Sequence, residues 1–270
     1  IMVNTFYGAN TNPYLGYGDM ATGITITAIA RFLLTTGIQL IQKKYGDKSV
    51  VYVHTDGINT NCDIDVEWLT KRLRLIFDAT IPNVESKWIS LDKDVFKEGL
   101  WIQIGNYVLR NMDNSITKHG STFKASTRST FYKQTINKLI DARLDNVVTK
   151  SFIDELYDFD NLPMETFIQR RTLNRKIEDY KSETDMMIPL VKQGLEVGIE
   201  PKIRTSYLYY KTKVGYKIEQ LVTSKTDLDV RYYWDIVSKL LDKFGVGHMI
   251  KKNPPLTILD RKQKSLLEWV

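Results

Sequence analysis

The sequence predicts an α+β fold whose second part is mainly helical. Three observations support this class: a β-rich run that turns back on itself at Ser49–Thr60, a helical pattern from Ser126 onward, and an amphipathic helical segment at Asp229–Phe244. The chain has 270 residues, of which 43% are hydrophobic and 26% charged. This balance is typical of a globular protein with a sizeable core and argues against wholesale disorder.

The charge balance fits more than one kind of partner. Lys plus Arg number 38 and Asp plus Glu 32, which gives a net charge of +6. A mild basic excess suits a polyanion such as nucleic acid, but a solvated basic face has the same composition. The single cysteine, Cys62, cannot close a disulfide within the chain, and this favours a reducing compartment.

The N-terminal part combines a loop with a long helix. Asn10–Asp19 is rich in Asn, Pro and Gly and predicts a loop, and Met20–Tyr45 predicts a helix. Within it, Ala21–Ile41 is apolar but is interrupted by Arg31 and Gln39. We therefore expect a buried helix of a globular domain rather than one that crosses a membrane, and no signal-peptide pattern is present.

A tight hairpin and a second helix follow. Ser49–Val53 predicts a strand, His54–Gly57 a turn and Ile58–Thr60 the returning strand. Asp65–Asp78 predicts a helix, because its apolar residues recur at helical spacing.

The rest of the chain changes character near Gly120. Before it, we expect strands at Trp88–Phe96 and Leu100–Arg110 and a turn at Asp113–Asn114. After it, helices are expected over 126–144, 151–160, 186–194 and 229–244, with a β-hairpin over 202–222 and a tail that begins at Pro254.

The residue with the clearest chemical potential is Asp56, in the predicted turn of the first hairpin. A carboxylate on a rigid turn can hold a metal ion in line with a reacting phosphate. An Asp in a turn can equally satisfy backbone N–H groups and have no further role. The local pattern leaves both interpretations open.

The string around this residue resembles a known family. VYVHTDG, residues 51–57, is similar to the third palm motif of family B DNA polymerases, archaeal or related viral, usually written YxDTDS or YxDTDG. The resemblance places Asp56 on the family's metal-binding aspartate. His54 stands where the family has its other aspartate; a structural role is expected for it, and metal binding is the alternative.

The first residues, IMVNTFYG, resemble the end of the family's second motif, K-x3-NSxYG. Asn4, Tyr7 and Gly8 match and are implied to lie against the nucleotide and the nascent base pair. The family's Lys would precede Ile1, so we expect the chain to be part of a larger polypeptide or a split subunit.

SLDKDVFKEGLW, residues 90–101, resembles the family's LExExxG strand. Asp92 and Asp94 then occupy its acidic positions, and on a strand both would face one side, toward the metal site. A solvated polar strand face is the alternative.

Residues 105–129 resemble the stretch from the KKxY motif to the T-R-G segment. Gly105 and Asn106 replace the paired Lys of the family. The implied DNA contacts are Tyr107, Lys118, His119, Gly120, and Lys124 and Arg128, the last two expected at i and i+4 on the next helix. A charged solvent face is again the alternative.

The C-terminal half resembles the family's thumb. It contributes Lys181 and Arg204 as DNA-backbone contacts, while Tyr232 and Tyr233 are expected in the core. The last residues, QKSLLEWV, resemble a clamp-binding motif through Gln263, Leu266 and Trp269.

Together, five such strings in family order imply a polymerase palm subdomain with its catalytic motif on a β-hairpin, followed by a mainly helical thumb. The implied divisions are the end of a fingers helix (1–8), the palm (9–120), the thumb (121–255) and the clamp-binding tail (256–270). Asp56 and Asp94 would bind two Mg²⁺ ions and, with Asp92, form the catalytic set.

The implied reaction is template-directed addition of dNMP to a primer 3′ end. The implied partners are primer-template DNA, dNTP, the remaining polymerase portion or a large subunit, and a sliding clamp, in the cytoplasm or in a viral replication complex. A catalytically inactive paralogue that acts as a DNA-binding or clamp-binding scaffold is the main alternative, and a general basic DNA-binding module is a third.

Overall fold

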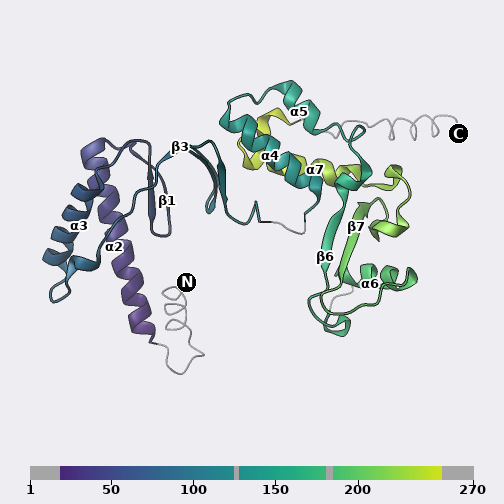
Figure 1. Cartoon of the computed structure of the whole chain (residues 1–270), viewed down its shortest axis with the longest axis horizontal. Coiled ribbons are helices and arrows are strands. Elements are labelled where there is room, and N and C mark those ends of the chain that lie inside the picture. Colours follow the sequence, from purple (N-terminus) through teal and green to yellow (C-terminus); the bar gives the residue numbers. More distant parts are fainter. Residues whose placement is uncertain (1–18, 125–127, 181–184, 251–270) are drawn as a thin grey trace. The chain divides into compact units, whose positions relative to one another are not determined.

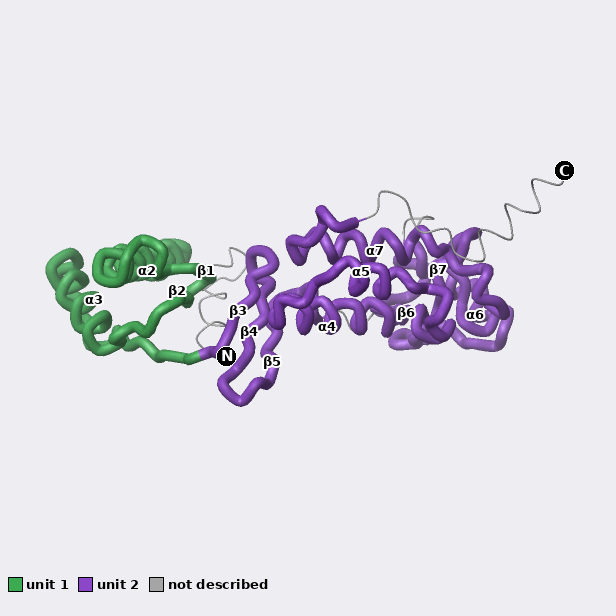
Figure 2. The backbone as a smooth tube through the Cα atoms, turned by 90° about the horizontal axis from the view of Figure 1, so that it is seen from above, with its two compact units in different colours: residues 1–95 green, residues 96–270 purple. Residues whose placement is uncertain are grey.

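The computed structural model describes residues 19–124, 128–180 and 185–250 (Figure 1). The chain divides into two compact units, residues 1–95 and residues 96–270 (Figure 2). Both units mix helices with small antiparallel sheets, so the α+β class is confirmed. The division at residue 95 is one of compactness, and the palm–thumb boundary near Gly120 stays a prediction.

Within residues 19–95, the first unit has two helices, a hairpin and a short 3-10 turn. Its elements are α2 (Met20–Tyr45), β1 (Val50–His54), β2 (Gly57–Thr60), α3 (Val66–Thr80) and a 3-10 turn at Ser86–Trp88. Their core contains Ile41, Ile64, Leu69, Leu73, Phe77 and Ile89, all buried. The hairpin joins this core through Val50 and Ile58, so it is not an isolated two-stranded sheet.

Helix α2 has the predicted bounds for identifiable reasons. Asp19 caps it, since its carboxylate accepts the Ala21 N–H at 3.0 Å. Gly46 ends it with a φ of 100°, a conformation that favours glycine, and donates its N–H to Gln42.

The expectation that α2 is a buried helix is wrong for the part of the chain that the structure describes. Its buried residues are Gly23, Gly37 and Ile41, and Ile24 is 62% exposed. Its main described neighbours are α3 and the hairpin, and most of its residues are not buried. The mean hydropathy of α2 reaches 1.6, so by length and composition it could cross a membrane. Core helices of globular proteins and signal sequences meet the same criterion.

The expected strand at Trp88–Phe96 does not form, because a side chain and a 3-10 turn take up the backbone hydrogen-bonding groups at its start. Ser86–Trp88 forms a 3-10 turn closed by the Ile89 N–H. The Arg74 guanidinium donates to the carbonyl of Ile89, at 2.7 and 2.9 Å, and to that of Lys87. The strand β3 begins only at Phe96.

In the part of the second unit that the structure describes, two three-stranded antiparallel sheets lie among helices. The main elements are β3 (Phe96–Gln103), β4 (Asn106–Asn111), β5 (Ile116–His119), α4 (Thr130–Leu144), α5 (Lys150–Leu156), β6 (Gln169–Thr172), α6 (Met187–Glu196), β7 (Ser206–Thr212), β8 (Gly215–Ile218) and α7 (Val230–Lys243). Short 3-10 turns lie at Met164–Phe167, Ile177–Asp179, Glu219–Leu221, Lys225–Asp227 and Gly247–Met249.

Several predicted elements of this unit are confirmed, and two are corrected. The hairpin β7–β8, the helix α7 and the Asp113–Asn114 turn stand as predicted. The expected strand Leu100–Arg110 is instead parts of two strands, because Gly105 turns the chain with a φ of 72°. The region expected to be mainly helical also contains the sheet β6–β7–β8.

Helices α4 and α7 pack together and hold the larger core of this unit (Figure 1). The apolar face of α7 buries Tyr233, Val237, Leu240 and Leu241, the 3.6-residue spacing that the sequence predicts. A smaller core lies between α6 and the sheet β6–β7–β8, and it includes Tyr207 and Tyr209. Burial raises the pKa of Tyr209 to about 12, so this residue stays a hydroxyl donor.

The expected core position of Tyr233 is confirmed, since the residue is 1% exposed. Its hydroxyl donates to the Phe167 carbonyl at 3.3 Å and accepts the Lys211 N–H at 3.2 Å. One phenol therefore joins α7 to the segment before β6 and to β7. Tyr232 is half-buried, and its hydroxyl donates to Gln169 at 3.4 Å.

We expect Tyr233→Phe to lower the free energy of unfolding by about 1–3 kcal/mol, because the buried Phe167 carbonyl and the partly buried Lys211 N–H lose their partner. Tyr232→Phe is the matched control and removes a hydroxyl that is only half-buried. Chemical denaturation followed by circular dichroism measures both. Equal stability of the two variants would contradict the linking role of the Tyr233 hydroxyl.

Candidate functional site

The tip of the β1–β2 hairpin is a two-residue loop. His54 pairs with Gly57 across the strands, which leaves Thr55 and Asp56 as the loop residues. Thr55 has a φ of 57°, whereas Asp56 does not share this left-handed conformation. A positive φ at the first loop residue alone is the pattern of a type II′ turn, in which glycine is usual. For a β-branched Thr, this conformation costs about 1–3 kcal/mol.

The two side chains beside this strained residue differ in their contacts. Asp56 is exposed and has no hydrogen bond or ion pair with any described residue. The His54 ring lies against Tyr52, with centroids 6.2 Å apart and an interplanar angle of 7°, and its Nδ1 is 3.1 Å from the Thr55 hydroxyl. His54 is therefore held by its own strand, while the Asp56 carboxylate is available to a ligand.

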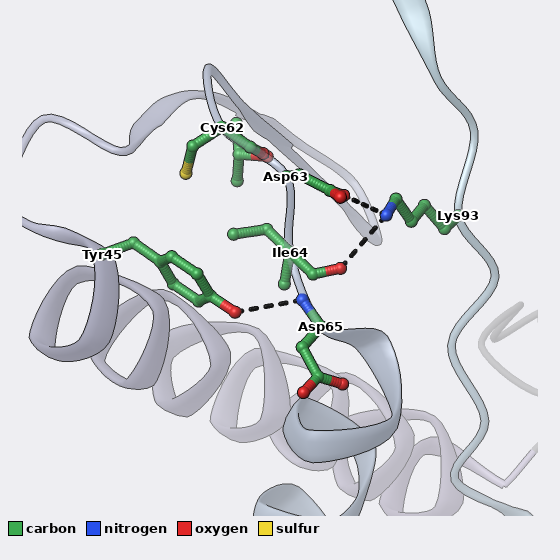
Figure 3. Close-up of polar contacts among 7 residues, drawn as sticks. Tyr45, Cys62, Asp63, Ile64, Asp65 and Lys93 are labelled. Carbon is green, nitrogen blue, oxygen red and sulfur yellow. Dashed lines mark hydrogen bonds and ion pairs between the residues drawn. The ribbon is translucent and has the colours of Figure 1, made fainter.

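Asp92 and Asp94 are exposed and lie in the segment before β3. The expectation that they share one face of a strand is wrong, because no strand forms at these positions. Lys93, which lies between them, attaches this segment to the loop before α3. Its ammonium pairs with the Asp63 carboxylate and donates to the Ile64 carbonyl (Figure 3).

The carboxylates can be compared with the needs of Mg²⁺. Oxygen ligands suit this ion, which is usually held by one or two carboxylates together with waters and substrate phosphates. Asp56, Asp92 and Asp94 supply this donor type, and none of them has a side-chain partner among the described residues. Among the described residues, however, no three His, Cys, Asp or Glu side chains gather closely enough to hold a metal ion. The residues therefore fit a partial ligand set, not a closed metal centre.

An open groove of about 570 Å³ runs along α3, lined by residues such as Lys71, Arg74 and Ser90. None of the predicted site residues that the structure describes lines it. The hairpin tip is thus an open surface feature of the first unit rather than the wall of this groove.

In the second unit, the structure brings Tyr107 and His119 together. They are partners across β4 and β5, and their rings stack with centroids 4.6 Å apart and an interplanar angle of 16°. Lys118 precedes His119 on β5 and so extends from the other face of the sheet. Its ammonium donates to Asn137 of α4 at 2.6 Å. The predicted contacts Tyr107 and His119 share one face, and Lys118 does not.

Gly120 ends β5 in a conformation that suits glycine. Its φ is 108°, and a Cβ atom there would overlap the Gly105 carbonyl oxygen and the Asn106 side-chain oxygen. The same Asn106 oxygen accepts the Thr122 N–H at 2.9 Å, and Asn106 is 5% exposed. In the sequence, Asn106 is conspicuous only because it replaces a Lys of the motif that residues 105–129 resemble. The glycine before it, which predicts a turn, was the available signal for its buried structural role.

Lys124 and Arg128 do not lie on a helix, and this expectation is wrong. Helix α4 begins at Thr130, because the Ser129 hydroxyl caps it by accepting the Tyr132 N–H. Both basic side chains are exposed, and the Arg128 guanidinium lies 5.2 Å from the centre of the Tyr132 ring.

Of the remaining predicted site residues, only Arg204 lies in the part of the chain that the structure describes. Arg204 is exposed in a turn, with a φ of 77°, and its N–H donates to Leu173 at 2.7 Å. Asn4, Tyr7, Gly8, Lys181, Gln263, Leu266 and Trp269 lie outside the described residues.

Comparison with known proteins places this geometry in a fold class. No known family matches the sequence, and no curated protein is similar to it. Among solved structures, the chain is similar to the family B DNA polymerase of the hyperthermophilic archaeon Pyrobaculum calidifontis, with a TM-score of 0.59 and 20% identity. The likeness covers 93% of this chain and 32% of the polymerase, so the chain spans about a third of that protein's length.

The structure therefore has a fold like that of part of a polymerase. More particularly, the solved structure that it resembles here is a family B DNA polymerase, the family that the sequence motifs resemble. At this level of identity the likeness concerns the fold.

We expect Gly120→Ala to destabilise the second unit more than Gly198→Ala does. Both positions have a positive φ, which costs an alanine about 1–2 kcal/mol. Only Gly120 faces backbone and buried side-chain atoms, and this crowding adds about 1–3 kcal/mol. Thermal unfolding of the two variants measures the difference, and equal losses would contradict the close approach at Gly120.

Proposed function

We propose that this chain is the palm and thumb portion of a family B DNA polymerase, which adds dNMP to a primer 3′ end under the direction of a template. The polymerase-like fold over 93% of the chain is the observation that carries the proposal. The position of Asp56 supports it, since the residue that matches the family's metal-binding aspartate lies at the exposed tip of a tight hairpin.

Asp56 is the residue to which we assign metal binding. Two Mg²⁺ ions, when bound, would activate the primer hydroxyl and neutralise the charge of the triphosphate. Asp56 supplies one carboxylate toward them, and Asp94, with Asp92, lies in the same unit. The further ligands come from polymerase residues outside this chain, in keeping with a chain about a third as long as its solved neighbour.

The strain at Thr55 supports a functional tip. A left-handed β-branched residue persists only where the surrounding structure fixes it, and such residues gather at active sites. Here the paired strands on both sides hold the loop, so the Asp56 backbone has one defined conformation. A rigid carboxylate loses less entropy when it binds an ion than a mobile one.

We assign primer-template contacts to the second unit. Tyr107 and His119 form a stacked aromatic pair on one sheet face, and Lys124 and Arg128 present exposed positive charge after the same sheet. Such groups position DNA through its backbone without reading the sequence. Lys118, Gly120, Lys181 and Arg204 complete this proposed set, and Asn4, Tyr7 and Gly8 are assigned to the nascent base pair.

A scaffold without catalytic activity is the second candidate. His54 in place of the family's other aspartate favours it, as does the absence of a three-ligand acidic group among residues 19–124, 128–180 and 185–250. Such a paralogue would keep the DNA-binding surface and the fold.

Asp56→Ala separates these two functions in the full-length polymerase that contains this chain. We expect the rate of primer extension to fall by several orders of magnitude, because a metal ligand is lost. Asp47→Ala, an exposed aspartate of the same unit, is the control and should leave the rate unchanged. An unaltered rate for Asp56→Ala would favour the scaffold. The isolated 270 residues should not extend a primer by themselves.

The proposed clamp contact has its own test. Deletion of residues 263–270 should abolish stimulation of processivity by a sliding clamp and spare unstimulated extension. Product lengths with and without the clamp measure this. Equal stimulation of the intact and the shortened protein would exclude the assignment of Gln263, Leu266 and Trp269.

A further inference from the structure

The rings of Tyr107 and His119 form a short stack that runs across the strands of their sheet. The two residues are partners across β4 and β5, and their ring centroids lie 4.6 Å apart at an interplanar angle of 16°. This separation is close to the spacing of neighbouring strands, about 4.7–4.9 Å. Nearly parallel rings at that spacing lie side by side, so one face of the His119 ring covers Tyr107 and the other is directed away from it.

The outer ring face of His119 lies at the edge of this sheet. The strand order is β3–β4–β5, and no further strand pairs with β5 in the part of the chain that the structure describes. His119 is exposed, and its ring has no hydrogen bond or ion pair with a described residue. One more planar group can therefore extend the stack beyond β5.

The stack lies on the sheet face that is turned away from α4. Val108, the residue after Tyr107, is completely buried in the core to which α4 contributes. Lys118, the residue before His119, donates to Asn137 of α4 at 2.6 Å. Successive side chains of a strand alternate between the two faces, so Tyr107 and His119 lie on the opposite face from α4.

Close packing after β5 fixes the position of His119. Gly120 follows it with a φ of 108° and approaches the Gly105 carbonyl oxygen and the Asn106 side chain so closely that a Cβ atom would overlap them. The Asn106 side-chain oxygen also accepts the Thr122 N–H at 2.9 Å. His119 is thus held by the strand pairing and by this turn, and a fixed ring loses little conformational freedom when a ligand stacks on it.

Exposed positive charge follows the stack along the chain. Between Gly120 and Lys124 the chain makes two overlapping turns, each closed by a hydrogen bond of 3.3 Å, so Lys124 stays near the end of β5. Arg128 is exposed as well, and neither Lys124 nor Arg128 has an ion pair with a described residue. This end of the sheet therefore combines an accessible aromatic ring with uncompensated cations.

A ligand that matches this combination has flat aromatic groups and negative charge, and nucleic acid has both. In a duplex, neighbouring bases already cover both sides of each internal base. An unpaired base is exposed on its faces and can stack on a protein ring. The chemistry of the stack thus favours a single strand over the interior of a duplex.

We propose that the outer ring face of His119 binds an unpaired base of single-stranded DNA by stacking, while Lys124 and Arg128 contact the phosphates of that strand. This inference rests on the proposed function, because it takes DNA as the partner, and it adds a base contact to a surface for which backbone contacts are proposed. A primer-template offers unpaired bases where the template extends beyond the primer. Stacking of this kind tolerates any sequence, since every base has a π-face.

The experiment measures the affinity of the 270-residue chain for a short, fluorescein-labelled single strand of dA by fluorescence anisotropy. We expect His119→Ala to raise the Kd about 5–100-fold, because the stacking of one base is lost. His119→Tyr keeps a ring without the imidazole and should stay within about 2-fold of the wild type. His119→Lys keeps a positive charge without a ring and should bind as weakly as His119→Ala.

An abasic strand of the same length and charge separates base stacking from phosphate contacts without any change in the protein. The wild-type chain should bind it more weakly than the dA strand. On the abasic strand, His119→Ala should cause no further loss, because the substitution and the missing bases remove the same interaction. Lys124→Gln should weaken the binding of both strands alike, because both carry the phosphates.

His248→Ala is the matched control for the histidine substitutions. His248 is an exposed histidine of the same unit, with no ring contact to a described residue, and its loss should leave both affinities unchanged. Thermal midpoints establish that each variant is folded.

The inference is overturned if the wild-type chain binds neither strand or binds the dA and abasic strands equally, or if His119→Lys binds dA as tightly as the wild type. Tighter binding of the matching RNA strand would overturn the assignment to DNA. The proposed function is judged separately by the primer-extension rate of Asp56→Ala, since that substitution leaves the sheet β3–β4–β5 unchanged.

Discussion

The closure of the β1–β2 hairpin in two residues is the constraint on which the candidate site depends. Direct pairing of His54 with Gly57 leaves no slack, so Thr55 takes a left-handed conformation that a β-branched residue normally avoids. Two strands alone would be marginally stable in water. Here Val50 and Ile58 anchor them in the core between α2 and α3, and that core sustains the strain at the tip.

The second unit is organised by buried polar contacts that join distant segments. The Tyr233 hydroxyl links α7 to β7 and to the segment before β6, and the Asn106 oxygen holds the chain as it leaves β5. Similarly, Gln193 of α6 contacts both the Tyr216 carbonyl and the Ile218 N–H, which satisfies the free edge of β8. Of these contacts, that of Asn106 lies on the sheet that carries the stacked pair Tyr107–His119, to which we assign primer-template contacts.

The acidic residues to which we assign metal binding form an open and partial ligand set. These residues are exposed and unpaired, yet they do not gather in threes within the part of the chain that the structure describes. Mg²⁺ accepts substrate phosphates and water as ligands, so an open, partial set of carboxylates suits phosphoryl transfer better than a closed cage. Such a set agrees with our proposal that the chain is one portion of a polymerase, since it spans about a third of the length of the solved structure that it resembles.

The sequence by itself determined the elements with strong periodicity and clear end signals. Asp19 and Gly46 bound α2, the α7 stripe predicts its buried face, and the VYVHTDG string predicts the hairpin tip, because each signal depends on local geometry. Tertiary structure decided where local patterns are ambiguous. Arg74 occupies carbonyls that a strand would have used, and α2 is left exposed by the lack of described neighbours. Partners distant in sequence, which no local pattern encodes, settle these cases.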